Sequence, residues 1–136
     1  MIDGFAPFRG TLSQSPEQLA KLLTFDSSVD RLADRIANYA MLKTSEDQTN
    51  SDYQSMVGRF RNIATKAGEA ASFIRPEVLA IDDDTMAEFM TSPALQRFRL
   101  MLERLTRYKP YTLGEKEEQL LAMQGEMAGS ASRIFR

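Results

Sequence analysis

Hydrophobic residues recur at helical spacing in five segments of this chain, and no segment shows the alternation typical of a β-strand. Ser15-Pro16 predicts the start of a short first helix, because Ser caps helix N-termini and Pro suits the first helical position. This helix is predicted to end near Leu23, and a second one to begin near Ser27 or Ser28. The predicted inward positions of the second helix are Val29, Leu32, Ala33, Ile36, Ala37, Ala40 and Met41.

The longest predicted helix runs from about Ser51 to Phe73, and it follows a polar segment. The candidate N-caps for it are Ser45, Asn50 and Ser51. Its predicted inward positions are Tyr53, Met56, Val57, Phe60, Ala64, Ala67, Ala71 and Ile74. Arg75-Pro76 is predicted to end or kink the helix, because proline lacks a backbone donor and restricts the residue before it. Residues 76–81 are candidates for one further helical turn.

Three more helical segments follow. The first is short and carries Met86, Phe89 and Met90. Ser92-Pro93 then repeats the Ser-Pro helix start, and this helix is predicted to stop before Pro110. Its inward positions are Leu95, Phe98, Leu102, Leu105 and Tyr108. The last predicted helix runs from Glu115 to about Ala128, with Leu113, Leu120, Leu121 and Met127 inward. The pattern as a whole predicts an all-α antiparallel bundle of about five helices, in a single domain over residues 1–136.

Composition narrows the functional classes. The chain has 136 residues, of which 43% are hydrophobic and 26% charged, as is ordinary for a globular protein. A net charge of −2 favours neither nucleic acid nor an anionic membrane as a partner. No apolar run approaches the roughly 18 residues of a membrane span, and the start lacks the features of a signal peptide. With no cysteine, the chain fits a reducing compartment, and we expect a cytoplasmic location.

The chain contains no histidine and no cysteine. It therefore cannot form a His-assisted serine triad, a two-His zinc helix, a thiol nucleophile or an iron–sulfur site. The chemistry that remains possible is that of carboxylate pairs, a lysine amine or a carboxylate metal site. These absences predict that the chain holds no catalytic, cofactor-binding or metal-binding residue.

Acidic clusters are the first candidates for chemistry. Asp82-Asp83-Asp84 could bind a hard cation, but the favoured interpretation is a solvated cap at the positive end of the next helix. Glu115, Glu117 and Glu118 are read in the same way, as first-turn residues that favour the helix dipole rather than as an acid–base pair.

Basic residues and methionines each allow two interpretations. A basic group consists of Arg97, Arg99, Arg104, Arg107 and Lys109. It is interpreted as a solvated helix face, with docking to another domain as the main alternative and nucleic-acid binding disfavoured. The chain has eight methionines, and five of them are predicted to fill the core rather than line a peptide groove: Met41, Met56, Met86, Met90 and Met127.

Four stretches of this sequence resemble the N-terminal helical region of oligoendopeptidase F-type zinc metallopeptidases, which are thimet-oligopeptidase-like enzymes. They are Phe5-Ala-Pro-Phe-Arg-Gly-Thr-Leu12, residues 32–52, Ala70-Ala-Ser-Phe-Ile-Arg-Pro-Glu77, and residues 107–122. The fourth stretch, around Lys109-Pro-Tyr-Thr-Leu-Gly-Glu115, is similar to the family pattern Lys-Pro-His-x-Leu-Ser-x-x-Glu-Glu-x-Leu-Leu. It departs from that pattern at Tyr111, where the family commonly has His, and at Gly114, where it commonly has Ser.

The resemblance implies hydrolysis of oligopeptides in the parent protein, by zinc-activated water in a domain that carries His-Glu-x-x-His. That motif is absent here, so this chain alone is expected to be inert and to bind no zinc. The implied partners are the catalytic domain of the same polypeptide and, in the parent, oligopeptide substrates. The implied role is to cover one side of the substrate cavity.

The structural and the functional interpretations are most evenly balanced for one turn, formed by Lys109, Pro110 and Tyr111. The structural interpretation is a helix stop and turn, and the functional one is contact with substrate or with the catalytic domain.

Apolar residues near both ends suggest a longer parent chain. Four of them are expected to be exposed and to favour self-association: Phe5, Phe8, Ile134 and Phe135. The alternative to a peptidase domain is a free-standing helical module that binds a protein or peptide between helices.

Overall fold

The computed structural model describes residues 2–111, which form five α-helices and three 3-10 helices with no strand among them. This confirms the predicted all-α fold. In chain order the elements are η1 (Ile2–Phe8), α1 (Pro16–Glu46), α2 (Ser51–Ala71), α3 (Ile74–Ala80), α4 (Asp83–Thr91), η2 (Pro93–Phe98), α5 (Arg99–Arg107) and η3 (Lys109–Tyr111). The predicted helix from Glu115 to Ala128 lies outside the described residues.

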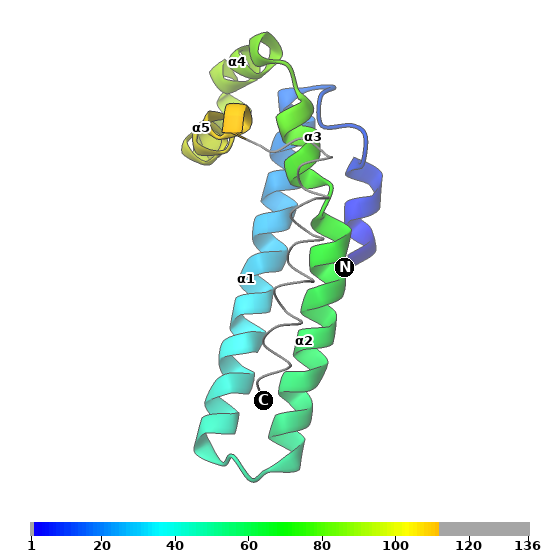
Figure 1. Cartoon of the computed structure of the whole chain (residues 1–136), viewed down its shortest axis with the longest axis vertical. Coiled ribbons are helices and arrows are strands. Elements are labelled where there is room, and N and C mark those ends of the chain that lie inside the picture. The colour runs from blue at the N-terminus through cyan, green and yellow to red at the C-terminus, as the bar shows by residue number, and fades with distance from the viewer. Residues whose placement is uncertain (1, 112–136) are drawn as a thin grey trace, which may run out of the picture. The chain divides into compact units, whose positions relative to one another are not determined.

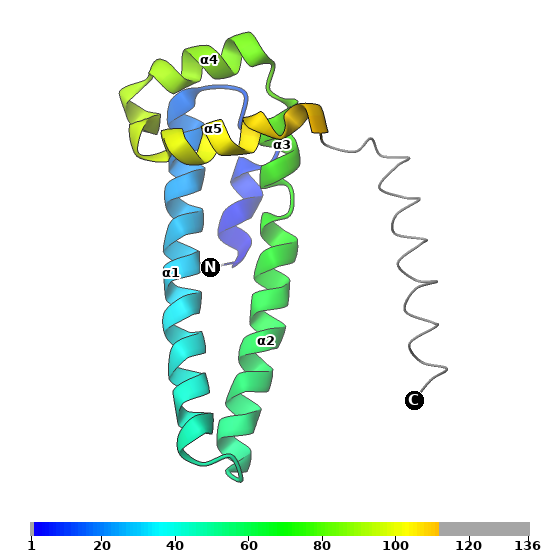
Figure 2. The same ribbon diagram turned by 60° about the vertical axis from the view of Figure 1, so that its left-hand side comes forward.

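Residue contacts divide the chain into two compact units, Met1–Leu102 and Glu103–Arg136. In the first unit, α1 and α2 run antiparallel and side by side, joined by a short loop (Figure 1). A second view shows the same hairpin with η1 beside it and α4 beyond the end opposite the loop (Figure 2). η1 packs on both long helices, and η2 packs on α1 and α4.

α1 is one continuous helix, so the predicted break between Leu23 and Ser27 is wrong. The polar residues in this stretch form their hydrogen bonds within the helix. The Thr24 hydroxyl donates to the carbonyl of Ala20 at 2.7 Å, and the Ser27 hydroxyl donates to that of Leu23 at 2.8 Å. No glycine or proline lies here to end the helix, and the burial of Leu23 holds it against the core.

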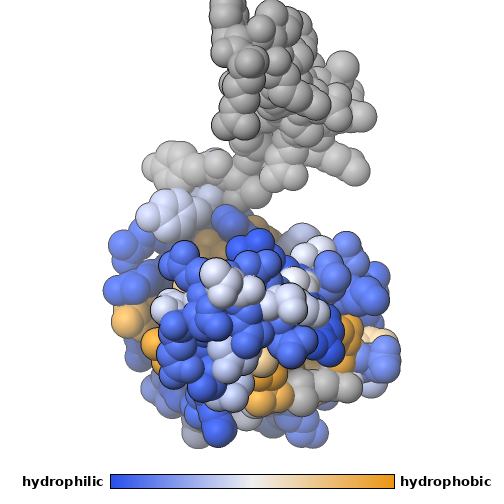
Figure 3. Space-filling view, turned by 90° about the horizontal axis from the view of Figure 1, so that it is seen from below, coloured by the Kyte–Doolittle hydropathy of each residue, from blue (hydrophilic) through white to orange (hydrophobic). Residues whose placement is uncertain are grey.

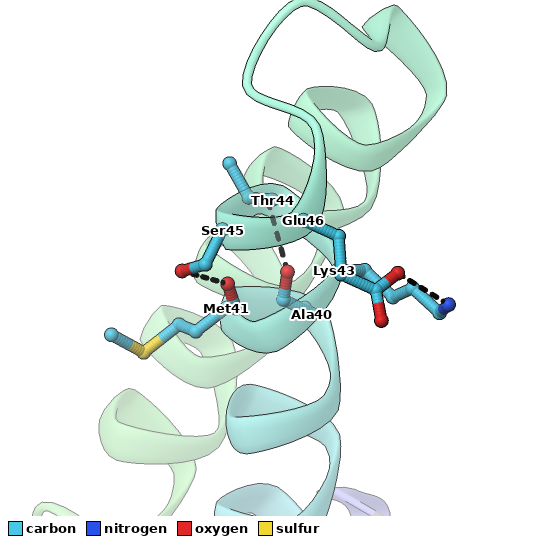
Figure 4. Close-up of polar contacts among 6 residues, drawn as sticks. All are labelled: Ala40, Met41, Lys43, Thr44, Ser45 and Glu46. Atoms are coloured by element: carbon cyan, nitrogen blue, oxygen red, sulfur yellow. Dashed lines mark hydrogen bonds and ion pairs between the residues drawn. The ribbon is translucent and has the colours of Figure 1, made fainter.

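The last turn of α1 uses the same kind of bond (Figure 4). The hydroxyls of Thr44 and Ser45 donate to carbonyls four residues earlier, each at 2.9 Å. Lys43 and Glu46 form an ion pair at 2.7 Å on the exposed surface of the same turn. These contacts carry the helix to Glu46, five residues beyond the predicted inward stripe.

Two helix starts follow the sequence signals. The Ser15 hydroxyl accepts from the backbone N–H of Gln18 at 3.1 Å, with Pro16 as the first residue of α1. The Asn50 side chain accepts from the N–H groups of Asp52 and Tyr53, at 2.9 and 3.2 Å. Asn50 is therefore the N-cap among the three candidates.

α2 ends at Ala71, two residues earlier than predicted, and α3 begins at Ile74. Pro76 lies in the first turn of α3, where backbone N–H groups have no partner inside a helix, so its missing donor costs little. The further helical turn is thus present as α3, but the predicted position of the interruption is wrong, because the break lies at Ser72-Phe73 and Arg75-Pro76 lies inside α3.

The segment after Ser92 starts where it was predicted to, but it begins as a 3-10 helix over Pro93–Phe98 and becomes α-helical at Arg99. In a 3-10 helix, residues three apart lie on one line. This places Leu95 and Phe98 together in the core, with 0% and 7% of their surfaces exposed.

The core of the first unit lies at the end of the hairpin where α1 begins. Its largest fully buried side chains are those of Phe5, Leu12, Leu19, Leu22, Leu95, Leu102 and Val78. Phe5 is only 2% exposed and Phe8 is half-buried, which corrects the expectation that both would lie on the surface, and Ile134 and Phe135 lie outside the described residues. Phe5 packs edge-on against Phe25 with ring centroids 4.9 Å apart, so η1 is held on α1 by aromatic contact.

The other half of the hairpin has no comparable core. Among the described residues, α2 contains no buried residue, and its predicted inward stripe is half-buried. On α1 the predicted inward residues Ile36 and Met41 are 44% and 63% exposed. Tyr108, which follows α5 and is not part of the hairpin, is 60% exposed as well. The prediction that Ile36, Met41 and Tyr108 point into a core is wrong, because a helical period defines a face but not what covers it.

Candidate functional site

Lys109, Pro110 and Tyr111 form the single 3-10 turn η3, after α5 has ended at Arg107. The predicted helix stop before Pro110 is therefore present. Pro110 is exposed and Lys109 is half-buried. A role of this turn in contacting substrate or another domain stays a prediction. The rest of the recognised motif, including Glu115, lies outside the described residues, as do Glu117 and Glu118.

The Asp82-Asp83-Asp84 cluster is an N-cap, as predicted. The Asp82 carboxylate accepts from the backbone N–H of Thr85 at 2.9 Å and caps α4. Hydrogen bonds from Thr85 hold the pKa of Asp82 below its usual value. All three carboxylates are exposed. They favour the helix dipole and need no metal to explain them.

This cap predicts a pH-dependent contribution to stability. Because the folded-state pKa of Asp82 is lowered, its stabilising effect is present above the unfolded pKa, near 4, and is lost as the pH falls through the lower folded value. Asp82→Asn keeps an acceptor but cannot titrate, so its stability should fall less than that of the wild type below about pH 4. Asp82→Ala should be less stable than both at pH 7. Urea midpoints at several pH values measure this, and parallel acid profiles for wild type and Asp82→Asn would contradict it.

The four arginines of the basic group lie on η2 and α5, whereas its fifth member, Lys109, is half-buried in η3. Arg97, Arg99, Arg104 and Arg107 are all exposed. The Arg97 guanidinium lies 5.1 Å from the ring centroid of Phe98, so part of this charge sits over an aromatic side chain of the core. Exposure of these arginines is expected both for a solvated face and for docking to another domain, so the favoured interpretation from the sequence stays a prediction.

The methionines divide between core and surface. Met86 is 3% exposed and fills the core as predicted, whereas Met56 and Met90 are half-buried and Met41 lies on the surface. Met127 lies outside the described residues. Met56 also lines the groove described below, so the core interpretation holds fully for Met86 alone among those described.

Two of the four recognised stretches meet in space. The backbone N–H of Gly10 donates to the Glu77 carboxylate at 2.7 Å, across 67 residues of sequence. Beside this bond the Arg9 guanidinium lies 5.1 Å from the ring centroid of Phe73. Gly10 has φ of 76°, a conformation that side-chain-bearing residues rarely adopt, so glycine frees the turn to present its N–H. Sequence reasoning missed this contact because nothing local links the two stretches.

Glu77→Ala should lower the free energy of unfolding by about 1 kcal/mol, the usual net value of one hydrogen bond. Glu77→Gln keeps an oxygen acceptor and should lose less than Glu77→Ala, because the neutral bond is only weaker. Urea unfolding of the three proteins measures both effects. Equal losses for Gln and Ala would show that the Gly10 bond contributes nothing measurable.

An apolar groove runs between α1 and α2, with a cavity of about 540 Å³. Val29, Leu32, Ala33 and Ile36 line it from α1, and Met56, Arg59, Phe60, Ile63, Ala64 and Ala67 from α2, with Ile2 at one end. Arg59 is the charged member of this lining. Viewed from the loop end of the hairpin, hydrophobic residues reach the surface between hydrophilic ones (Figure 3).

Residues 2–111 contain no group of three or more His, Cys, Asp or Glu side chains that could hold a metal ion. In the same part of the chain, no helix is both long and apolar enough to cross a membrane.

The Asp26 carboxyl has a shifted pKa. Burial raises this pKa, and the nearby charge of Asp30 raises it further.

Comparisons with known proteins identify the relatives of this helical fold. The profile of the family described as Oligopeptidase F matches residues 77–136. Oligopeptidase PepF of Bacillus subtilis is 32% identical to this chain over a match that covers 99% of this chain and 20% of PepF. Group B oligopeptidase PepB of Streptococcus agalactiae is 29% identical over 98% of the chain, which spans 22% of PepB.

Solved structures agree with these sequence matches. The crystal structure of oligoendopeptidase-F from Enterococcus faecium matches 98% of this chain with a TM-score of 0.75 and 30% identity, over 26% of that protein. A putative peptidase from Chlamydophila abortus matches 95% of the chain with a TM-score of 0.82 and 25% identity, over 22% of its own chain. The chain is an N-terminal region of the oligoendopeptidase F type. It spans about a fifth to a quarter of the length of these relatives.

Proposed function

We propose that this chain is the non-catalytic N-terminal helical domain of a cytoplasmic zinc metalloendopeptidase that acts on oligopeptides. In that role it forms part of the wall of the substrate cavity. The observation that carries the proposal is the match of almost the whole chain to about a fifth of an oligopeptidase. The catalytic domain would then belong to the remaining four fifths of the same polypeptide.

Residues 2–111 do not fit a zinc site. The chain has no histidine or cysteine, and residues 2–111 offer no metal-binding group of acidic side chains. The zinc ligands are therefore assigned to residues of the parent outside this chain. What these residues supply is a stiff support, in which the buried core joins η1, α1 and η2 into one unit.

A domain of this kind acts by limiting access. Packed helices cannot open to admit a folded protein, whereas an extended oligopeptide is narrow enough to enter a cavity beside them. The proposal therefore predicts that the parent cleaves short unstructured peptides and leaves folded proteins intact.

The test compares the 136-residue chain with the full-length parent on a fluorogenic oligopeptide. The parent should cleave the peptide and lose activity with a chelator, and the 136-residue chain should show no cleavage. Chelator-sensitive cleavage by the short chain would overturn the non-catalytic assignment. An inactive parent, or cleavage of a folded protein as fast as of the peptide, would overturn the proposed peptidase role.

Tyr111→Ala in the full-length parent tests the η3 turn separately. We expect unchanged peptide turnover and a lower thermal midpoint, because the structural interpretation makes this turn a helix stop. A higher KM or lower kcat with an unchanged thermal midpoint would instead assign Tyr111 to substrate contact.

The groove between α1 and α2 favours a second candidate, the free-standing module that binds a protein or peptide between helices. A reading frame that stops directly after Arg136 would support that module. A frame that continues to an encoded His-Glu-x-x-His would support the peptidase.

A further inference from the structure

The hairpin formed by α1 and α2 leaves an apolar surface uncovered by residues 2–111. Ile36 on α1 is 44% exposed and Ile63 on α2 is 58% exposed, and both line the same groove. Single exposed hydrophobic residues are common on protein surfaces, but a continuous hollow lined by them marks an interaction surface. The fully buried side chains of the core lie at the other end of the unit, where α1 begins.

The shape of this groove suits a helix. Its walls are two antiparallel helices, and its lining includes the small residues Ala33, Ala64 and Ala67, which allow close approach of a third helix. Larger side chains, among them Phe60, line the same groove and provide ridges for packing. A helix that lays its apolar face between two others is a common mode of recognition.

Charge adds a second requirement for the occupant. Arg59 is exposed, lines the groove, and makes no ion pair with any of residues 2–111. The other lining residues are apolar. A docked segment would leave the Arg59 guanidinium partly out of water, and a carboxylate on that segment would offset this cost through a charge-assisted hydrogen bond.

We propose that this groove seats an amphipathic helix from the remainder of the parent polypeptide, with its aliphatic face between α1 and α2 and a carboxylate at Arg59. The inference rests on the proposed function. Its support is the length of the relatives, since the chain spans 20% of PepF and 22% of PepB and the remaining length would supply the helix. The groove is thus where this region is attached to the rest of its protein.

Cysteine labelling of the full-length parent tests the proposal. This chain has no cysteine, so a single introduced thiol in it is read by mass spectrometry of one peptide. Ile63→Cys places the thiol in the groove, and Asn62→Cys, the next residue along α2, places a control outside the lining. With a charged maleimide, Ile63→Cys should react about tenfold or more slowly than Asn62→Cys, because it reacts only when the interface opens. Ile36→Cys on α1 repeats the test should Ile63→Cys fail to fold.

A charge variant tests the identity of the occupant. Arg59→Glu should remove the protection of Ile63→Cys, and Arg59→Lys should keep most of it. Equal reactivity at positions 63 and 62 would overturn the proposal, and protection unaffected by Arg59→Glu would overturn the carboxylate. Protection that depends on protein concentration, or that appears only with added oligopeptide, would assign the groove to a second copy or to substrate and also overturn it.

These outcomes separate the inference from the proposed function. If the parent cleaves oligopeptides while Ile63→Cys reacts freely, the docking proposal fails and the peptidase role stands. If the parent cleaves nothing, the peptidase role fails whatever the labelling shows.

Discussion

Leu22→Ala is expected to lower the free energy of unfolding of this chain by about 2–5 kcal/mol. Leu22 is 0% exposed and lies in the part of α1 that forms the core with η2. Removing its methyl groups loses their transfer free energy and leaves a cavity that close-packed neighbours fill only in part. A domain of this size is stable by only about 5–15 kcal/mol, so the variant should unfold at a clearly lower urea concentration.

The matched control is Leu42→Ala, the same substitution in the same helix at a side chain that is 67% exposed. Its effect should stay within about 0.5 kcal/mol, because alanine favours helix and little burial is lost. Circular dichroism during urea titration measures both variants. Similar losses at the two positions would contradict the placement of the core at the end where α1 begins.

Helix starts were predictable from the sequence because their causes are local. Ser15 and Asn50 cap the helices that follow them, and Asp82 does the same for α4. In each case a short side chain accepts hydrogen bonds from backbone groups two or three residues ahead. The all-α fold follows from the same local information together with the helical period.

What covers a helix face was not predictable in the same way. Periodicity assigned Ile36, Met41 and Ala40 to one inward face, yet Ala40 is 1% exposed whereas Ile36 and Met41 are 44% and 63% exposed. The period of 3.6 residues selects a stripe, and burial depends on elements distant in sequence. The predicted break near Ser27 failed for a related reason, since hydroxyl side chains that often begin a helix can also bond within one.

The candidate site shows the same difference between features with local causes and features that depend on distant segments. The turn at Lys109–Tyr111 was recognised from a local motif, and the structure contains it as η3. The bond between Gly10 and Glu77 and the groove around Arg59 were not recognised, because each joins segments far apart in the chain. Both arise from the way α2 folds back along α1, and no short motif encodes that.

Buried side chains are distributed unevenly along the hairpin. The end at Leu22 is stabilised by its own core, whereas the stretch around Ile63 presents apolar surface outward. In a region that spans about a fifth of its relatives, such a surface is what attachment to a larger protein requires. If the groove seats a helix as proposed above, stability of the short chain and docking in the parent should be altered independently, at separate positions.

Gly4→Ala is expected to lower the free energy of unfolding by about 1–3 kcal/mol, although it adds a single methyl group. A Cβ atom at Gly4 would lie 2.5 Å from Cζ of Phe25. Phe5 packs on that ring edge-on at 4.9 Å and Phe8 stacks on it at 6.3 Å between centroids, so a shift of the ring would disturb both contacts. The methyl group must therefore push η1 away from α1 or disrupt this aromatic cluster.

Gly58→Ala is the matched control and should act in the opposite direction. Gly58 lies within α2, and a Cβ there meets nothing within 4 Å. Alanine in a helix loses less backbone entropy on folding than glycine, so this variant should gain about 0.5–1 kcal/mol. Urea midpoints that move apart, lower for Gly4→Ala and higher for Gly58→Ala, would support the close approach of η1 to Phe25. A gain at both positions would show that η1 does not pack on α1 as described.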